Sequence, residues 1–321
     1  MKRVLVLGSV VLAGALAAAA GAVSAQQQPG AATPGQGRGQ GDGRQGGGGR
    51  GGGPVGMIQK ITDNLYMIPG QGGNSGVYVA ANGVVLVDTK NPNNGQGILD
   101  QVKTVTDKPV THIINTHTHG DHNGSNVFFP ATVEIVTHEN TSANMQKMPA
   151  FQDAANKHGL PDRTFKERMT VLSGNDSIDL YYFGAAHTNG DALVVFRNAR
   201  VMHAGDMFAG KGQPLIDRPN GGSGVAYGET IQKAAGGIKN VDRVITGHST
   251  VMPWQDFVDF GEFNRVFLSH ARESMKMGKT PEQAMMDFKL PEKFTGYTIT
   301  GGRGGPGGNF GIIFEELKTA K

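Results

Sequence analysis

Apolar residues along the chain recur with two different periods, and these predict both strands and helices. Residues 58–69 and 75–88 are rich in Val, Ile, Leu and Tyr, which is typical of strands. Asn82-Gly83 interrupts the second stretch between two apolar runs and predicts a hairpin turn. In residues 95–107, by contrast, Ile98, Val102 and Val105 lie at helical spacing.

The same pattern continues through the second half of the chain. Short apolar runs with polar turns between them alternate with longer segments of helical period. This interleaving predicts an α/β layered domain whose functional residues lie at the ends of its strands. Further strands are predicted at 110–115, 132–136, 177–183, 192–197, 200–204 and 243–246, and helices at 138–148, 228–239 and 254–277.

The first 56 residues have a different character. Residues 1–25 begin with Lys2 and Arg3, continue through an apolar run and end in Val23-Ser24-Ala25, which is typical of a cleaved secretory signal peptide. A membrane anchor is the alternative, because residues 4–23 are nearly long enough to span a bilayer. Residues 26–56 contain 14 glycines in 31 positions and little to bury, so we expect a disordered linker. Residues 57–321 then form one large domain.

Charge and cysteine content narrow the classes of function. The chain has a net charge of +3, but residues 1–56 hold five basic residues and one acidic residue, which leaves the rest at about −1. A nucleic-acid-binding face is therefore not indicated. The chain has no cysteine, so it has neither disulfides nor a lipid-modified cysteine, and any metal site must use His, Asp, Glu or backbone groups.

The most informative stretch directly follows the predicted strand 110–115. It reads His117-Thr118-His119-Gly120-Asp121-His122, three imidazoles and a carboxylate within six residues. His117 and His119 are two apart in extended chain and point to one side, where they can share an ion. Gly120 permits a tight turn that redirects Asp121 and His122 toward a second position. Imidazole and carboxylate ligands suit zinc, although such sites also accept iron or manganese.

One loop cannot complete two metal sites, so further ligands must come from elsewhere. Three candidates lie where predicted strands end: His187, Asp206 and His248. With these residues in this order, the sequence resembles the metallo-β-lactamase superfamily over essentially all of residues 57–321. The resemblance implies a four-layer αββα sandwich. It also implies that His117, His119 and His187 hold one metal, that Asp121, His122 and His248 hold a second, and that Asp206 bridges the two.

Departures from the family pattern narrow the choice among its branches. A bridging Asp206 is more similar to the glyoxalase II, lactonase and alkylsulfatase branches than to the true β-lactamases. His119, rather than a glutamate, argues against the redox di-iron branch. Export and an almost uncharged domain argue against the RNA-processing branch.

We therefore predict an exported, periplasmic hydrolase with two Zn2+ ions per chain. Zinc lowers the pKa of bound water toward about 7, so a metal-bound hydroxide, held by Asp121, would attack a small ester, thioester, lactone or amide. β-Lactam hydrolysis is one alternative, and a non-catalytic metal-binding accessory or sensor is another. The expected partner is a small-molecule substrate, with no nucleic acid and no stable membrane insertion after cleavage; the sequence leaves the substrate and the oligomeric state open.

Other polar residues receive structural interpretations. Asp88 ends a strand and is expected to bind loop backbone near the site, and His203 is placed to orient Asp206 by a hydrogen bond. His112 is expected in the core or beside the ligands, and Lys211 on the surface. The stretch 301–308 reads as a flexible loop, with a flap over the site as the alternative. His138, His158 and His270 are expected to be surface residues.

Overall fold

The computed structural model describes residues 54–299 and 307–319, all within one compact unit. The predicted signal peptide and most of the predicted linker lie outside these residues, as do positions 301–306 of the predicted loop. At the start of the described chain, Val55 is already buried and the amide of Gly56 donates to the carbonyl of Pro69. The described chain contains no helix long and apolar enough to cross a membrane.

Two β-sheets form the centre of the molecule. The first has seven strands in the order β1-β2-β3-β4-β5-β6-β7, and the second has six in the order β13-β12-β11-β10-β9-β8. The bounds in the first sheet are β1 Gln59–Lys60, β2 Leu65–Ile68, β3 Ser75–Ala80, β4 Gly83–Val87, β5 Val110–Ile114, β6 Glu134–His138 and β7 Arg163–Phe165. Those in the second are β8 Arg168–Val171, β9 Ile178–Tyr181, β10 Leu193–Phe196, β11 Val201–His203, β12 Arg243–Ile245 and β13 Met252–Pro253.

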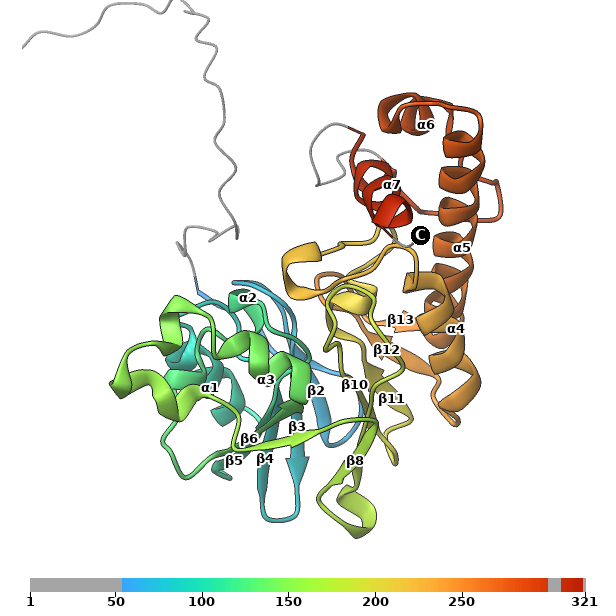
Figure 1. Cartoon of the computed structure of the whole chain (residues 1–321). Helices are drawn as coiled ribbons and strands as arrows, with labels where there is room; N and C mark the ends of the chain where they lie inside the picture. Colours follow the sequence, from blue (N-terminus) through green and yellow to red (C-terminus); the bar gives the residue numbers. More distant parts are fainter. Residues whose placement is uncertain (1–53, 300–306, 320–321) are drawn as a thin grey trace, which may run out of the picture. The chain divides into compact units, whose positions relative to one another are not determined.

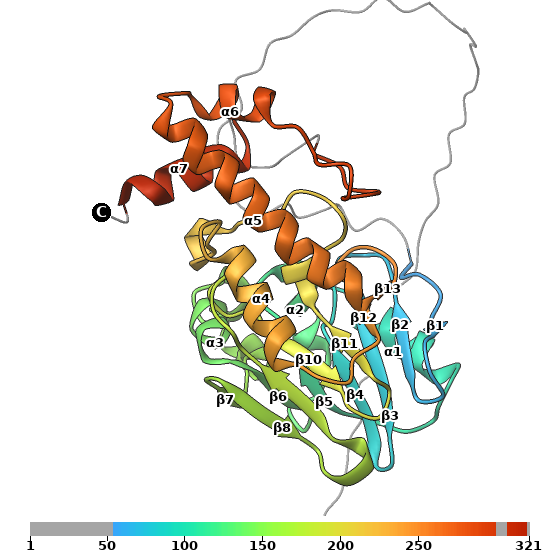
Figure 2. The same ribbon diagram turned by 90° about the vertical axis from the view of Figure 1, so that its right-hand side faces the viewer.

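Helices cover the outer faces of both sheets. Figure 1 shows α1 and α3 beside the first sheet and α4 and α5 beside the second, and Figure 2 shows α4 and α5 running across the second sheet. The predicted four-layer αββα sandwich is thereby confirmed. The helices are α1 Gly95–Lys103, α2 Gly120–Asn123, α3 Glu139–Met145, α4 Tyr227–Gly237, α5 Trp254–Lys276, α6 Pro281–Asp287 and α7 Asn309–Thr319.

Successive side chains on the strands serve different layers of the core. In β10, Val194 and Phe196 point into the apolar cluster between the two sheets, whereas Leu193 and Val195 join the cluster beneath α4 and α5. The strands are therefore apolar on both faces, as expected when both faces of a sheet are covered. This packing explains why their sequences read as continuous apolar runs.

Strand direction brings the ends that carry functional residues to one edge. β4, β5 and β6 run parallel to one another, and in the second sheet β11 runs parallel to β12. Segments that leave the carboxyl ends of parallel neighbours emerge at the same edge of a sheet. β9 runs in the same direction as β11, because both are antiparallel to β10. The loops after β4 and β5, and those after β9, β11 and β12, can therefore build a common site.

The predicted hairpin forms, but its turn is one residue earlier than expected. Ala80 pairs with Gly83, so Ala81 and Asn82 make the turn and Gly83 is the first residue of β4. A side chain at Gly83 would collide with Thr111 on β5. The glycine therefore serves strand packing, and the Asn-Gly signal located the hairpin but not its register.

Candidate metal centre

Four of the seven predicted site residues lie in the segment after β5. His119 lies in extended chain, with φ −74° and ψ 144°, and His117 lies two residues before it, in a bend over residues 116–118. The chain then turns into the short helix α2, which carries Asp121 and His122. The helical turn begins directly after His119, and the four residues fall into the two pairs that the sequence predicted.

The other three predicted residues come from loops around the second sheet. His187 lies between β9 and β10, Asp206 lies in the 3₁₀ turn Gly205–Phe208 after β11, and His248 follows β12. The structure brings all three to the loop that follows β5. One group contains His117, His119, His187 and Asp206, and the other contains Asp121, His122 and His248; within each, candidate ligand atoms lie within 4.8 Å of one another.

The first group consists of three imidazoles and one carboxylate oxygen. His119 Nδ1 lies 3.2 Å from His117 Nε2 and 3.0 Å from His187 Nε2. Asp206 Oδ2 lies 4.0 Å from His117 Nε2 and 3.8 Å from His187 Nε2. Four potential donors thus surround one small volume.

Asp206 also faces the second group, through its other oxygen. Oδ1 lies 3.3 Å from His122 Nε2 and 3.2 Å from His248 Nε2. Those two nitrogens are 3.3 Å apart, and Asp121 Oδ2 lies 3.4 Å from His248 Nε2. A single carboxylate therefore presents one oxygen to each group.

Hydrogen bonds on the outer side of the rings fix which nitrogens face inward as lone pairs. His119 Nε2 donates to Asp217 Oδ2 at 2.6 Å, and His187 Nδ1 donates to the carbonyl of Leu215 at 2.8 Å, since both acceptors lack a proton to give. Thr116 Oγ donates to Asp88, so it accepts from His117 Nδ1 at 2.9 Å. In the neutral form of each of these three rings, the inner nitrogen is therefore the one without a proton.

This arrangement suits a divalent cation. Lone pairs 3.0–3.2 Å apart repel unless a positive charge lies between them, and zinc–imidazole bonds of about 2.0–2.1 Å at tetrahedral angles place two nitrogens about 3.3 Å apart. Asp206 Oδ1 is buried and has no hydrogen-bond partner among the described residues. A cation in the second group would give this oxygen the partner that it lacks. The residues present therefore fit metal binding at both groups.

The pKa values of the buried ligands indicate how metal and proton compete. Burial, with added repulsion from His122 and His187, lowers the pKa of His117 well below its ordinary value, and burial lowers the pKa of His187 to about 4. Burial also acts against protonation of His122, but the carboxylates of Asp206 and Asp88 outweigh it and raise that pKa well above its ordinary value. At neutral pH a metal ion must therefore displace a proton from His122, but none from His117 or His187.

Asp88 supports both groups from beneath. It is fully buried and accepts hydrogen bonds from the Thr116 amide at 2.8 Å, from Thr116 Oγ at 2.7 Å and from His122 Nδ1 at 2.7 Å. It thus orients His122 directly and His117 through Thr116. The predicted contact with loop backbone is present, but the bonds to two ligand-bearing segments are the larger role.

The residues Gly70–Asn74 cross the site and connect its two halves. The Gly73 amide donates to the carbonyl of Asp121 at 2.9 Å, and the Asn74 amide donates to the carbonyl of Gly247 at 2.7 Å. Beneath them, the fully buried ammonium of Lys90 donates to the carbonyls of Ile68 at 2.7 Å and Gly73 at 2.9 Å. Burial lowers the pKa of Lys90 to about 7, against the opposing charge of Asp88.

Sequence reasoning missed Asp217 and Lys90. Asp217 lies 98 positions from His119, in a Gly-, Pro- and Asn-rich loop with no periodic pattern, so no sequence signal connects the two. Lys90 offered a weak signal, because it follows an apolar strand by only three residues. Both Asp88 and Lys90 have left-handed backbone, with φ 64° and 66°, which marks a sharp turn.

Several predictions for individual histidines were wrong. His203 does not bond Asp206; its Nε2 bonds the carbonyl of Asn74 and its Nδ1 accepts from the Gly205 amide. His138 is buried rather than exposed, because it ends β6 facing inward and stacks on Tyr182. His112 is only half-buried and pairs with Glu134. Lys211, His158 and His270 are half-buried as well: Lys211 pairs with Asp256, and the two histidines bond backbone carbonyls.

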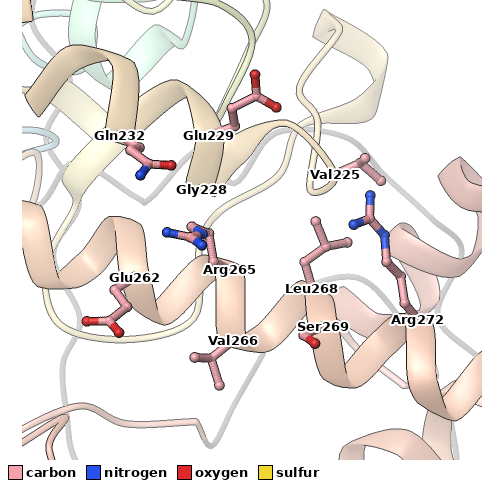
Figure 3. Close-up of a pocket in the computed structure, with 10 residues that line it drawn as sticks. All are labelled: Val225, Gly228, Glu229, Gln232, Glu262, Arg265, Val266, Leu268, Ser269 and Arg272. Atoms are coloured by element: carbon pink, nitrogen blue, oxygen red, sulfur yellow. The ribbon is translucent and has the colours of Figure 1, made fainter. Parts of the chain in front are cut away.

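The candidate metal centre opens to solvent on one side. The side chains of His119, Asp121 and His248 are 29%, 30% and 34% exposed, whereas those of the other four residues are buried. A separate groove of about 730 Å3 lies between α4 and α5 and is lined by Arg265 and Arg272 among others (Figure 3). None of the seven candidate ligands lines that groove.

Comparison with known proteins agrees with the fold. The structure resembles the stereoselective inverting sec-alkylsulfatase Pisa1 from Pseudomonas sp., with a TM-score of 0.68 and 14% identity over 81% of this chain. The chain spans 50% of the length of that enzyme. It also resembles a metallo-beta-lactamase from Pontibacter korlensis (TM-score 0.55, 20% identity, 66% of this chain and 99% of that one) and the DIM-1 metallo-beta-lactamase (0.55, 16%, 66% and 98%). At these identities the likeness concerns the fold alone.

Membership rests on a direct match of the sequence. Residues 68–248 match the model of the metallo-beta-lactamase superfamily, and this span includes all seven residues of the candidate centre. The resemblance noted in the sequence is thereby confirmed. The chain belongs to the metallo-β-lactamase superfamily.

Proposed function

We propose that this chain is an exported dinuclear zinc hydrolase that acts on a small ester, thioester, lactone or amide. The observation that carries the proposal is the position of Asp206, whose two oxygens face two separate sets of imidazoles. Because His and Asp are the only side-chain types in both sets, zinc is the favoured ion.

A pair of zinc ions, when bound, supplies Lewis-acid polarisation and lowers the pKa of water. The protein's part is to hold the ions and to orient the side chains that bind them. Asp88, Asp217 and the carbonyl of Leu215 fix the tautomers of the ligand rings, so that lone pairs point inward before any ion arrives. No serine or cysteine nucleophile is required.

Asp121 is the proposed catalytic residue. Its carboxylate is about one-third exposed at the open side of the centre and lies near His248, whereas Asp206 is buried between the two groups. Asp121 is thus placed to orient the attacking water and to hold its proton where substrate enters. The half-exposed rings of His119 and His248 border the same opening.

β-Lactam hydrolysis remains the alternative, and the bridging position of Asp206 counts against it. The experiment is elemental analysis of the purified protein, with turnover of nitrocefin, an S-acyl glutathione, a simple lactone and a secondary alkyl sulfate. The sulfate is included because the alkylsulfatase shares the fold over most of this chain. We expect about two zinc ions per chain and turnover of a panel member other than nitrocefin.

Asp121→Ala and His187→Ala serve as controls, and each should lower bound metal and activity together. Unchanged rates of turnover in both variants would contradict the proposed mechanism. Nitrocefin as the preferred substrate would favour the β-lactamase, and full metal occupancy without turnover of any panel member would overturn the hydrolase proposal.

We also propose export to the periplasm. The basic start, the apolar run and the small residues of positions 1–25 support a cleaved signal peptide. Expression of the full chain in a Gram-negative host, followed by amino-terminal sequencing of the periplasmic fraction, tests this. We expect the mature protein to begin after Ala25; an uncleaved chain in the membrane fraction would favour the anchor.

A further inference from the structure

The loop between the 3₁₀ turn at Asp206 and helix α4, residues 210–226, holds two ligands of the first group in place. Asp217 accepts from His119, and the carbonyl of Leu215 accepts from His187. The loop also bonds the chain around His187, because the Asp217 amide donates to the carbonyl of His187 at 2.9 Å and the Ser223 amide donates to that of Ala186 at 2.9 Å. The first group therefore depends on where this loop lies.

Hydrogen bonds within the loop are concentrated in the turn 217–222, where the amides of Asn220 and Gly222 donate to the carbonyl of Asp217 and Arg218 donates to the carbonyl of Gly222. Apart from one short turn of 3₁₀ helix at Arg218–Asn220, the described residues of the loop belong to no helix and to no strand. Its segment 217–224 reads Asp-Arg-Pro-Asn-Gly-Gly-Ser-Gly, and Gly221 has a left-handed backbone with φ 73°. Such a sequence loses much conformational entropy when it is fixed. Contacts from other parts of the chain help to offset that cost.

Helix α7 provides such contacts on the side of the loop away from the centre. Figures 1 and 2 both show α7 beside this loop. Asn309 Nδ2, at the start of α7, donates to the carbonyl of Pro214 at 2.6 Å. Ile313 is buried and packs so closely on Gly224 that a Cβ added there would collide with it.

Glu316 on α7 makes the densest set of contacts. Its carboxylate accepts hydrogen bonds from Ser223 Oγ, from the Gly224 amide at 2.9 Å and from the Val225 amide at 3.3 Å, and it pairs with Arg218 at 3.3 Å. The side chain is only 14% exposed, so water competes weakly for these bonds. Charge-assisted bonds of this kind are about twice as strong as neutral ones.

We propose that α7 clamps the loop 210–226 and thereby sets the zinc affinity of the first group, with Glu316 as the positioning residue. This rests on the proposed function, because it assigns α7 a role toward the metal. α7 lies beyond the residues that match the family model, which end at 248. The second group should be independent of the clamp, since Asp88 and the residues Gly70–Asn74 support it instead.

The test measures zinc binding at each group separately. In a His248→Ala background we expect only the first group to bind zinc strongly, and in a His187→Ala background only the second. Competition with a chromophoric chelator then gives the zinc dissociation constant with and without Glu316→Gln. Loss of a ligand's hydrogen-bond partner typically weakens metal binding about 10–100-fold. We therefore expect Glu316→Gln to raise the zinc dissociation constant of the first group about tenfold and to leave that of the second group unchanged.

Two comparison variants separate positioning from a general loss of stability. Glu315→Gln is the matched control, because Glu315 lies on the same helix, is exposed and pairs only with Lys318 among the described residues. Asp217→Asn should weaken the first group as well, and the double variant Asp217→Asn/Glu316→Gln should fall short of the sum of the two effects, since both act through one loop.

Hydrogen exchange of the metal-free protein gives a readout that needs no metal. Glu316→Gln should speed exchange at the amides of Asp217 and Ser223, which donate to the chain around His187, and leave the Gly73 amide unchanged. If neither parent binds zinc, the proposed function and the role of α7 toward the metal both fail. If the parents bind zinc but Glu316→Gln leaves both constants unchanged, or weakens both equally, the clamp alone is overturned.

Discussion

Asp88→Asn is the substitution that most directly tests the support beneath the metal centre. The carboxylate of Asp88 accepts three hydrogen bonds, two on Oδ2 from Thr116 Oγ and His122 Nδ1 and one on Oδ1 from the Thr116 amide. An asparagine keeps only one oxygen. If that oxygen takes the Oδ1 position, two bonds are lost; if it takes the Oδ2 position, its NH2 group faces the Thr116 amide.

The expected loss of stability follows from these contacts. A hydrogen bond to a buried charged group contributes about 1.5–3 kcal/mol, so losing two lowers the free energy of unfolding by about 3 kcal/mol or more. In a domain of this size about 1 kcal/mol corresponds to about 2–4 °C, which predicts a drop in melting temperature of about 6–12 °C. Zinc binding should weaken about 10–100-fold, because the carboxylate that orients the His122 ring is lost.

The assay combines thermal unfolding of the metal-free protein with chelator competition. Asp100→Asn is the control, because Asp100 is exposed on α1 and accepts a side-chain bond only from Gln96 among the described residues. An Asp88→Asn protein that melts within about 1 °C of the wild type and binds zinc with unchanged affinity would refute the reasoning.

Three further substitutions test other parts of the structure. Gly73→Ala places a methyl group against the His122 ring, so zinc binding at the second group should weaken in the His187→Ala background; an unchanged dissociation constant would contradict this packing. Lys90→Met removes two buried hydrogen bonds and should lower the free energy of unfolding by about 2–3 kcal/mol. The pKa of Lys90 is about 7 when folded and about 10.4 when unfolded, so the unfolded chain binds more protons between these values. The stability of the wild type relative to Lys90→Met should therefore rise from pH 7 to pH 9 in urea denaturation, and a constant difference would count against it. Arg197 and Thr170 hold the pKa of Asp179 below its ordinary value against the effect of burial, so its stabilisation is present above about pH 4 and disappears as the pH falls through the folded pKa. The difference in melting temperature between wild type and Asp179→Asn should thus be steady near neutral pH and shrink in acid; a difference that grows in acid would exclude this interpretation.

Much of the architecture could be predicted because local patterns and the fold agree. The helix predicted at 254–277 is observed as Trp254–Lys276, and the strand predicted at 110–115 as Val110–Ile114. The seven candidate ligands could be named because each lies where an apolar run ends, and such ends meet at one edge of the sandwich.

The supports around the ligands could not be predicted, for a physical reason. Asp217, Glu316 and Lys90 act through contacts between segments with no repeating pattern, and such contacts depend on tertiary packing alone. Strand β7 and helix α6 also went unpredicted, because three and seven residues are too few to show a period. His138 shows the converse, since a polar residue at a strand end can point into the core and still bond backbone there.

The seven candidate ligands span positions 117 to 248 and reach the centre from both sheets of a chain that contains no cysteine. A cation held among them would tie the two halves of the sandwich together much as a disulfide ties distant parts of a secreted protein. At a free concentration 100 times its dissociation constant, such a tie stabilises the fold by about 2.7 kcal/mol. Zinc starvation would then act on this protein as a reductant acts on a disulfide-bonded one, lowering its resistance to heat and proteases along with its activity.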